Sequence, residues 1–307
     1  MNSTIEQHNI NGTRLTVAER HAPEVDGVAR GVLLLHGWPG TRHDWDPVFE
    51  RLAGSSGWHG VTLICPDLRG YGESDVPRVE ADSDEPFAAY GPAAHVADMT
   101  ELIDGYGLGE LVIGAYDLGA NIGQALARAL PDRVRGMVLC DPVHAAARAQ
   151  AGKVNLTGEL WYQVLHAQPW ADELIAHDRE TTEIYLRHFY THWWGEGQVD
   201  EAHFQALVDR YSEPGAFAAS IGWYRARARG RAGEAAAAAG ADPISTPTEV
   251  LWGELDPITP VIFSESVDQS FTDASLTRLS GVGHFAPLEA PDEVVGAFDR
   301  LATRLGW

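Results

Sequence analysis

Short apolar runs alternate with helical patterns along much of this chain, and no other feature constrains its fold as strongly. Buried strands are expected at Gly31–Leu35, Val61–Cys65, Leu111–Ala115 and Gly136–Cys140, with amphipathic helices between them. Strands and helices that alternate in this way form a parallel sheet covered by helices on both faces. The sequence therefore predicts an α/β fold.

This alternation stops after Asp141 and resumes near residue 241. Residues 142–240 are rich in Trp, Tyr, His and Ala, and they show helical periodicity without a clear strand. Two further strand patterns and a final helix follow. We therefore expect a core domain formed by residues 1–141 and 241–307, with a mostly parallel sheet flanked by helices, and an inserted helical cap, or lid, at 142–240.

Composition limits the classes of partner. The chain has 44 acidic and 22 basic residues, a formal net charge of −22, which repels nucleic-acid phosphates and anionic lipid surfaces. No apolar stretch reaches the length of a membrane span, and the N-terminus lacks the pattern of a signal peptide, so we expect a cytoplasmic protein. Cys65 and Cys140 belong to apolar strand patterns, which predicts reduced core thiols.

The motif that carries most chemical information is the segment Leu111–Ala120, in which a strand runs directly into a helix. Small residues lie close to Asp117 on both sides, Ala115 before it and Gly119 and Ala120 after it, as a tight turn between strand and helix requires. The turn presents the side chain of Asp117 at a helix N-terminus. A carboxylate is ionised at neutral pH and suits displacement at a saturated carbon, which leaves an alkyl ester on the protein. We therefore predict that Asp117 is a nucleophile, with helix capping as the simpler alternative.

A second motif, His36–Gly40, follows the first buried strand. A loop in this place offers backbone N–H groups to an oxyanion, unless it is an ordinary turn at the end of a strand. The N–H of Trp38 in this loop and that of Leu118, directly after the predicted nucleophile, form the expected pair of donors.

Two late residues complete a candidate catalytic triad. Asp256 ends one late strand pattern, and His284 lies in a glycine-flanked loop after the next. The order nucleophile, acid, histidine occurs in known triads on sheets of this kind. His284 is predicted to activate water and Asp256 to orient its ring, while Asp141, which ends an earlier strand, is the alternative acid.

Together these motifs resemble the α/β-hydrolase fold, specifically its aspartate-nucleophile branch, over nearly the whole chain. That branch contains epoxide hydrolases, haloalkane dehalogenases and fluoroacetate dehalogenases, so the resemblance implies the fold and a covalent ester but leaves the reaction open. In one departure from the family pattern, Tyr116 occupies the position before the nucleophile, where His is common. We expect Tyr116 to pack beneath the turn.

Two tyrosine segments of the insert favour epoxide hydrolysis. The residues around Tyr162 resemble the first lid tyrosine segment of soluble epoxide hydrolases, and those around Tyr224 resemble the second. A phenol is neutral at pH 7 and can donate its proton to the oxygen of an opening epoxide. Aromatic packing of the lid on the core is the alternative for each tyrosine. Four tryptophans are expected to line an apolar substrate pocket: Trp38, Trp161, Trp193 and Trp223.

The dehalogenases differ at the residue after the nucleophile, where haloalkane dehalogenases usually carry Trp and fluoroacetate dehalogenases carry Arg, whereas this chain has Leu118. The resemblance therefore implies an epoxide hydrolase that converts an apolar epoxide and water into a vicinal diol. A haloalkane or haloacid dehalogenase, or a binding protein that has lost turnover, remains the alternative. No metal-ligand spacing is found and no cofactor is implied, while the choice between monomer and homodimer stays open.

Overall fold

The central element is one eight-stranded sheet with the order β1-β2-β4-β3-β5-β6-β7-β8. The computed structural model describes residues 3–23, 27–77, 87–150, 154–229 and 242–307 of the chain. β2 pairs antiparallel with β1 and β4, and all other neighbouring strands are parallel. The strands are β1 (Thr4–Ile10), β2 (Thr13–Arg20), β3 (Arg30–Leu35), β4 (Thr62–Pro66), β5 (Glu110–Tyr116), β6 (Val134–Cys140), β7 (Thr248–Gly253) and β8 (Ala274–Leu279).

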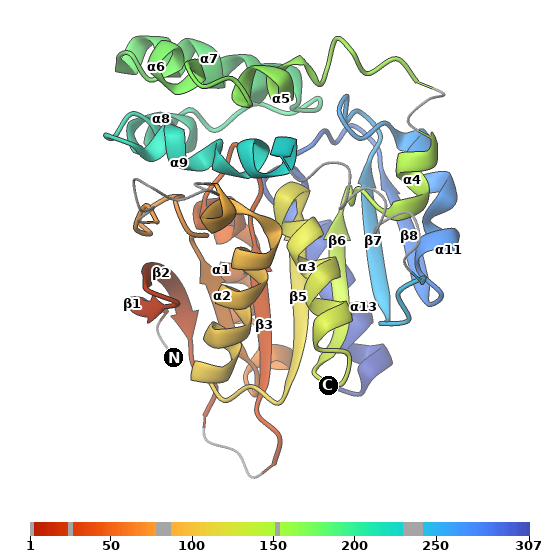
Figure 1. Ribbon diagram of the computed structural model, residues 1–307. Helices are drawn as coiled ribbons and strands as arrows, with labels where there is room; N and C mark the ends of the chain where they lie inside the picture. The colour runs from red at the N-terminus through yellow and green to blue at the C-terminus, as the bar shows by residue number, and fades with distance from the viewer. Residues whose placement is uncertain (1–2, 24–26, 78–86, 151–153, 230–241) are drawn as a thin grey trace.

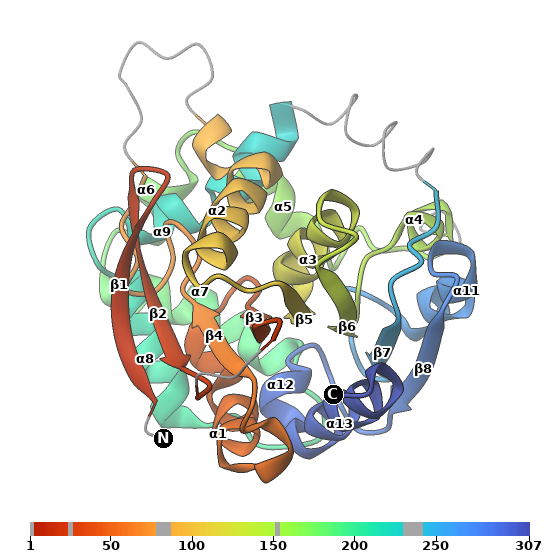
Figure 2. The ribbon, with the colours of Figure 1, turned by 90° about the horizontal axis from the view of Figure 1, so that it is seen from below.

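Helices cover both faces of this sheet, as Figures 1 and 2 show. On one face α2 (Pro92–Gly105) packs against α3 (Asp117–Ala129), and on the other α1 (Asp46–Gly54) packs against α13 (Pro291–Leu305). The central strands β3, β4 and β5 are buried along nearly their whole length, because helices exclude water from both of their faces. The predicted α/β architecture is thus confirmed.

The parallel strands bring distant segments of the chain together at one edge of the sheet. β3, β5, β7 and β8 all end at this edge, and Trp38, Asp117, Asp256 and His284 follow them in that order. In open parallel sheets, the carboxyl ends of the strands are the usual location of ligand sites. Residues separated by more than two hundred positions in the sequence are therefore neighbours in the fold.

A layer of helices lies over this edge (Figure 1). Hydrogen bonds tie it to the core, among them those in which Tyr71 Oη donates to the carbonyl of Ser220 at 2.7 Å and Tyr211 Oη donates to that of Gly40 at 3.2 Å. We call these elements the cap helices: α5 (Trp161–His166), α6 (Ala171–Ile175), α7 (Arg179–His192), α8 (Glu201–Tyr211), α9 (Ala216–Ser220) and a helix over residues 222–229.

Not every helix between residues 142 and 240 belongs to this layer. α4 (Ala145–Gln150) contacts η5 (Val261–Ser266) and α11 (Val267–Ser270) beside β8, as Figure 1 also shows. The expected end of the cap at residue 240 lies outside the described residues. The division into core and cap domains at 142 and 240 therefore stays a prediction.

The remaining elements are short connections: η1 (Arg42–Trp45), η2 (Ser56–Trp58), η3 (Ala88–Tyr90) and α12 (Ala286–Glu289). None of the helices in the described ranges combines the length and the hydropathy that a membrane span requires.

Candidate active site

Asp117 lies at the sharp turn where β5 passes directly into α3. Its φ is +49°, in the left-handed region that residues other than glycine rarely adopt. The turn requires Gly119, because a Cβ at that position would lie 2.3 Å from the main-chain oxygen of Leu35. The carboxylate is therefore placed at the N-terminus of α3, where free N–H groups and the helix dipole favour negative charge.

The loop after β3 contacts this carboxylate. The backbone N–H of Trp38 donates to Asp117 Oδ1 at 2.8 Å, and Gly37 allows the approach, because a Cβ there would lie 2.6 Å from Asp117 Cβ. Leu118 is in the first turn of α3, where N–H groups have no partner within the helix. Of the two predicted oxyanion donors, the N–H of Trp38 thus contacts the carboxylate, and the N–H of Leu118 belongs to the residue directly after Asp117.

His284 and Asp256 meet on the other side of Asp117. His284 Nδ1 and Asp256 Oδ2 are 2.7 Å apart, and His284 Nε2 lies 3.6 Å from Asp117 Oδ2. Asp256 is fixed in turn by the backbone N–H groups of Ile258 and Thr259, which donate to its Oδ1 at 2.8 and 3.0 Å. The three residues predicted as a triad are thus in line: carboxylate, imidazole and carboxylate.

The charges of Asp117, Asp256 and His284 determine the protonation of one another. Burial alone would lower the pKa of His284, but the carboxylates of Asp256 and Asp117 raise that pKa well above its usual range. Burial would raise the pKa of Asp256, whereas the charge of His284 and the hydrogen bonds that Asp256 accepts hold that pKa below its usual value. In the resting site Asp256 is therefore ionised and stabilises a positive charge on the imidazole.

Asp141, the alternative acid, lies nearby without a hydrogen bond to His284. Its Oδ1 accepts from the backbone N–H of Gly253 at 2.8 Å, and its Oδ2 has no hydrogen-bond partner among the described residues. Burial, with the charge of Asp256, raises the pKa of Asp141 well above its usual range. The geometry therefore assigns the imidazole contact to Asp256, while burial favours the neutral form of the Asp141 carboxyl group.

Both predicted tyrosines are buried and lie on the wall of one cavity with Asp117. Tyr162 comes from α5 and Tyr224 from the helix over 222–229, and the centroids of their rings lie 5.7 Å apart. Gln163 Nε2 donates to Tyr162 Oη at 3.3 Å. Burial is the main cause that raises the pKa of both phenols. The charge of Asp117 raises the pKa of Tyr162 further, and Tyr162 and Asp117 raise that of Tyr224. Both groups therefore stay protonated and able to donate.

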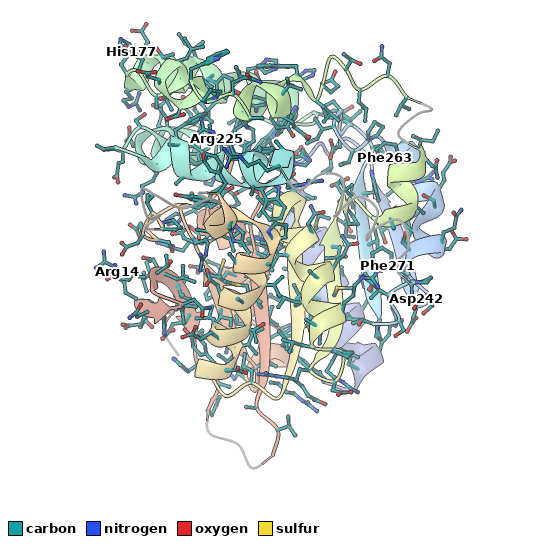
Figure 3. All side chains as sticks on the ribbon, in the orientation of Figure 1. Arg14, His177, Arg225, Asp242, Phe263 and Phe271 are labelled. Carbon is teal, nitrogen blue, oxygen red and sulfur yellow. The ribbon has the colours of Figure 1, made fainter. Side chains whose placement is uncertain are left out.

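The cavity has a volume of about 230 Å³ and a mixed lining. Apolar side chains from the core and from the cap helices form much of its wall, including Phe263, which is labelled in Figure 3. Polar groups also contribute: Gln163 and Arg227 were not predicted as site residues from the sequence, although Arg227 follows Tyr224 by three positions, the spacing of one helix face. The lining comprises Asp117, Leu118, Asn121, Val143, Leu156, Leu160, Tyr162, Gln163, Trp223, Tyr224, Arg227, Ile258, Thr259 and Phe263.

Of the four tryptophans expected in the pocket, Trp223 lines the cavity and the other three lie outside its lining. Trp38 is fully buried and stacks on Tyr162, with ring centroids 5.4 Å apart. The ring of Trp193 lies 5.2 Å from that of His284, and Trp161 is 39% exposed and stacks on Phe189. Trp38 and Trp193 therefore pack against the predicted site residues Tyr162 and His284, whereas Trp161 packs only within the aromatic cluster of the cap helices.

A buried polar network beneath the turn was not foreseen. Tyr116 is fully buried under Asp117, as expected, and its phenol donates to Asp44 in η1. His203 Nε2 from cap helix α8 lies 3.0 Å from Asp44 Oδ1. Although burial opposes it, the carboxylate of Asp44 raises the pKa of His203. The network therefore links Tyr116, which precedes Asp117 in the chain, to the cap helices.

Within the ranges that the structure describes, no group of three or more His, Cys, Asp or Glu side chains is arranged to hold a metal ion. The prediction that no cofactor takes part stays a prediction.

The chain is similar to several known proteins. A family model described as alpha/beta hydrolase fold matches residues 31–291. The chain is 25% identical over 308 residues to the soluble epoxide hydrolase of Corynebacterium sp. (strain C12), covering 96% of each protein. It is 30% identical over 159 residues to the fluoroacetate dehalogenase of a Burkholderia species, covering 51% of this chain and 49% of that protein. The solved structure of epoxide hydrolase CorEH without ligand superposes with a TM-score of 0.81 at 23% identity, covering 99% of this chain and 100% of that one, which shows the shared fold.

Proposed function

Since this chain belongs to the alpha/beta hydrolase fold family and has epoxide hydrolase relatives, we propose that it hydrolyses an epoxide to a vicinal diol. In this proposal Asp117 is the nucleophile, and His284, oriented by Asp256, is the general base. Tyr162 and Tyr224 donate to the epoxide oxygen.

One observation carries the proposal: a carboxylate and two neutral phenols share the wall of the same cavity. Opening an epoxide requires a nucleophile behind one ring carbon and a proton donor at the ring oxygen. Asp117 supplies the first from the core, and Tyr162 and Tyr224 supply the second from the cap helices. We further propose that residues 142–240 act as a cap domain that closes the site from water.

In the first step, Asp117 Oδ2 attacks a ring carbon from the side opposite the carbon–oxygen bond, which breaks. Asp117 Oδ1 stays on the N–H of Trp38 and becomes the carbonyl oxygen of the new ester. The electron pair of the broken bond passes to the ring oxygen, which takes a proton from Tyr224 or Tyr162. The result is a hydroxyalkyl ester and a phenolate.

In the second step, a water molecule loses a proton to His284 and attacks the ester at Asp117 Cγ. Formation of the ester has removed one of the two carboxylate charges that raise the pKa of His284, so the imidazolium first gives its proton to the phenolate left by the first step and becomes a neutral base. The N–H groups of Trp38 and Leu118 stabilise the tetrahedral oxyanion. The hydroxyl group added at Cγ gives its proton to the leaving alkoxide, so the diol departs with one oxygen from Asp117, Asp117 is again a carboxylate with one oxygen from water, and His284 keeps the proton taken from water.

A dehalogenase is the second candidate, because the chain is also similar to a fluoroacetate dehalogenase. The two functions need different groups at the leaving atom: an epoxide oxygen needs an acidic donor, while a halide needs fixed N–H donors. The phenols favour the epoxide. Leu118, in the position after the nucleophile, adds no donor from its side chain.

We expect the purified protein to form diols from a panel of styrene-type, terpene and fatty-acid epoxides, and to release little halide from bromoalkanes or fluoroacetate. The panel is read by product chromatography and halide release by an ion-selective electrode. Halide release that is faster than diol formation with every epoxide would assign the site to the dehalogenase class instead.

Replacing Tyr224 with Phe should slow ester formation about a hundredfold while hydrolysis of the preformed ester changes little, because the phenol acts on the ring oxygen and not at the ester carbon. Tyr162→Phe should act on the same step. Rapid-quench single-turnover kinetics separate the two rates. Tyr185→Phe is a matched control, since Tyr185 belongs to the same aromatic cluster, hydrogen-bonds to His166 and lies outside the cavity lining. Unchanged ester formation in the double Tyr162, Tyr224 variant would remove both phenols from the reaction.

A further inference from the structure

Arg227 is a basic side chain on the wall of the same cavity as Asp117. It lies on the helix over residues 222–229, three positions after Tyr224 and therefore on the same helix face. Three residues correspond to a rise of about 4.5 Å along the helix axis. A ligand whose epoxide oxygen is held by Tyr224 consequently has the guanidinium group of Arg227 about one helical turn away.

The guanidinium group has no acidic partner among the residues that the structure describes. Its recorded contact is with the ring of Trp223, whose centroid lies 6.0 Å from the guanidinium carbon. The preceding arginine on the helix is different: Arg225, labelled in Figure 3, is 9% exposed, donates to the carbonyl groups of His166 and Gln168, and pairs with Asp172. Arg225 thus holds the cap helices together, whereas Arg227 is left available to a ligand.

Basic residues are scarce in this chain, in which acidic residues outnumber them by 44 to 22. Among the described residues that line the cavity, Asp117 is the one acidic residue and Arg227 the one basic residue. The cavity is therefore polarised, with the nucleophile on the core side and a cation on the cap. Guanidinium groups bind carboxylates through two parallel hydrogen bonds, with geometric selectivity as well as charge.

Building on the proposed epoxide hydrolysis, we propose that the substrate is an epoxide that carries a carboxylate a few bonds from the ring, and that Arg227 binds this carboxylate. The net charge of −22 disfavours the approach of anions in general, so that a local cation is what admits an anionic substrate to this cavity. Arg227 then determines specificity, and the expected apolar epoxide is replaced by an epoxy acid. The apolar wall contacts the carbon chain between the two polar ends.

The test compares terminal epoxy-alkanoates of increasing chain length with the corresponding primary amides, which match them in shape and lack the charge. We expect the wild-type protein to prefer the acid over the amide in kcat/KM at one or more chain lengths. Arg227→Gln should reduce that preference about tenfold or more, mainly through KM, and Arg227→Lys should restore part of it. High salt should reduce the wild-type preference as well, which gives a readout that does not depend on the folding of a variant.

Arg229→Gln is the matched control, because Arg229 lies on the same helix, outside the cavity lining, with its guanidinium carbon 4.8 Å from the ring centroid of Phe87. This variant should keep the wild-type ratio of acid to amide. Equal hydrolysis of acids and amides by the wild-type protein, or an equal loss of preference in Arg227→Gln and Arg229→Gln, overturns the assignment of Arg227. Either result leaves epoxide hydrolysis standing. Failure of acids and amides alike to give any diol would instead count against the proposed function itself.

Discussion

Replacement of Asp117 with Ala is expected to reduce diol formation by about ten-thousand-fold or more, since it removes the atom that bonds to the substrate. A single turnover of the wild-type protein in water enriched in the heavy oxygen isotope should place the label in the peptide that contains Asp117, and not in the diol. The reason is that water attacks Asp117 Cγ, so that the diol takes its second oxygen from the carboxylate. Mass spectrometry of the digested protein and of the product measures both.

Asp141→Asn provides the matched control for this experiment. Like Asp117, Asp141 follows a strand and has a positive φ, here +47°, which Asn tolerates; it is buried, and its raised pKa favours the neutral form of the carboxyl group. The variant should therefore keep most of the activity. Label in the diol of the first turnover, or substantial turnover by the Asp117→Ala variant, contradicts the covalent route.

The positions of the three catalytic candidates could be predicted because strand and helix periodicity is a local signal. Apolar runs located the strands, and parallel strands necessarily bring their carboxyl ends to one edge. Asp117, Asp256 and His284 each follow such a run, so their proximity was predictable from the order of elements. The choice between Asp256 and Asp141 was not, because both aspartates follow neighbouring strands and the imidazole contact depends on the path of each loop.

The cap was less predictable, because its short helices are placed by long-range packing and not by periodicity. Trp161 carries an aromatic ring in a predicted pocket segment, yet the orientation of α5 leaves it 39% exposed. His203 meets Asp44 across a sequence separation of 159 residues, which no local pattern reveals. Arg227 lies one helical turn beyond a predicted site residue, and helical spacing was the signal that could have found it.

Replacing His284 with Gln should separate the two halves of the reaction. Gln keeps a polar side chain between the two carboxylates but cannot take a proton from water, so the ester should form and then hydrolyse at least about a thousandfold more slowly. We expect the variant to consume one equivalent of epoxide per protein and then to stop. Intact-mass spectrometry should show the protein heavier by the mass of one epoxide, with the added mass on the peptide that contains Asp117.

A buried histidine elsewhere in the core tests whether this arrest is specific. In His144 both ring nitrogens are engaged, with Ser270 Oγ at 2.9 Å and the carbonyl of Phe263 at 3.1 Å, and the side chain makes no hydrogen bond to the catalytic carboxylates. His144→Gln should therefore continue to turn over without an accumulated adduct. If the His284 variant is inactive and also free of adduct, His284 is needed before or during alkylation, and its role as a base that acts only on the ester is wrong. Accumulation in the His284 variant alone places proton abstraction from water after bond formation at Asp117, the order that the loss of one carboxylate charge beside the imidazole requires.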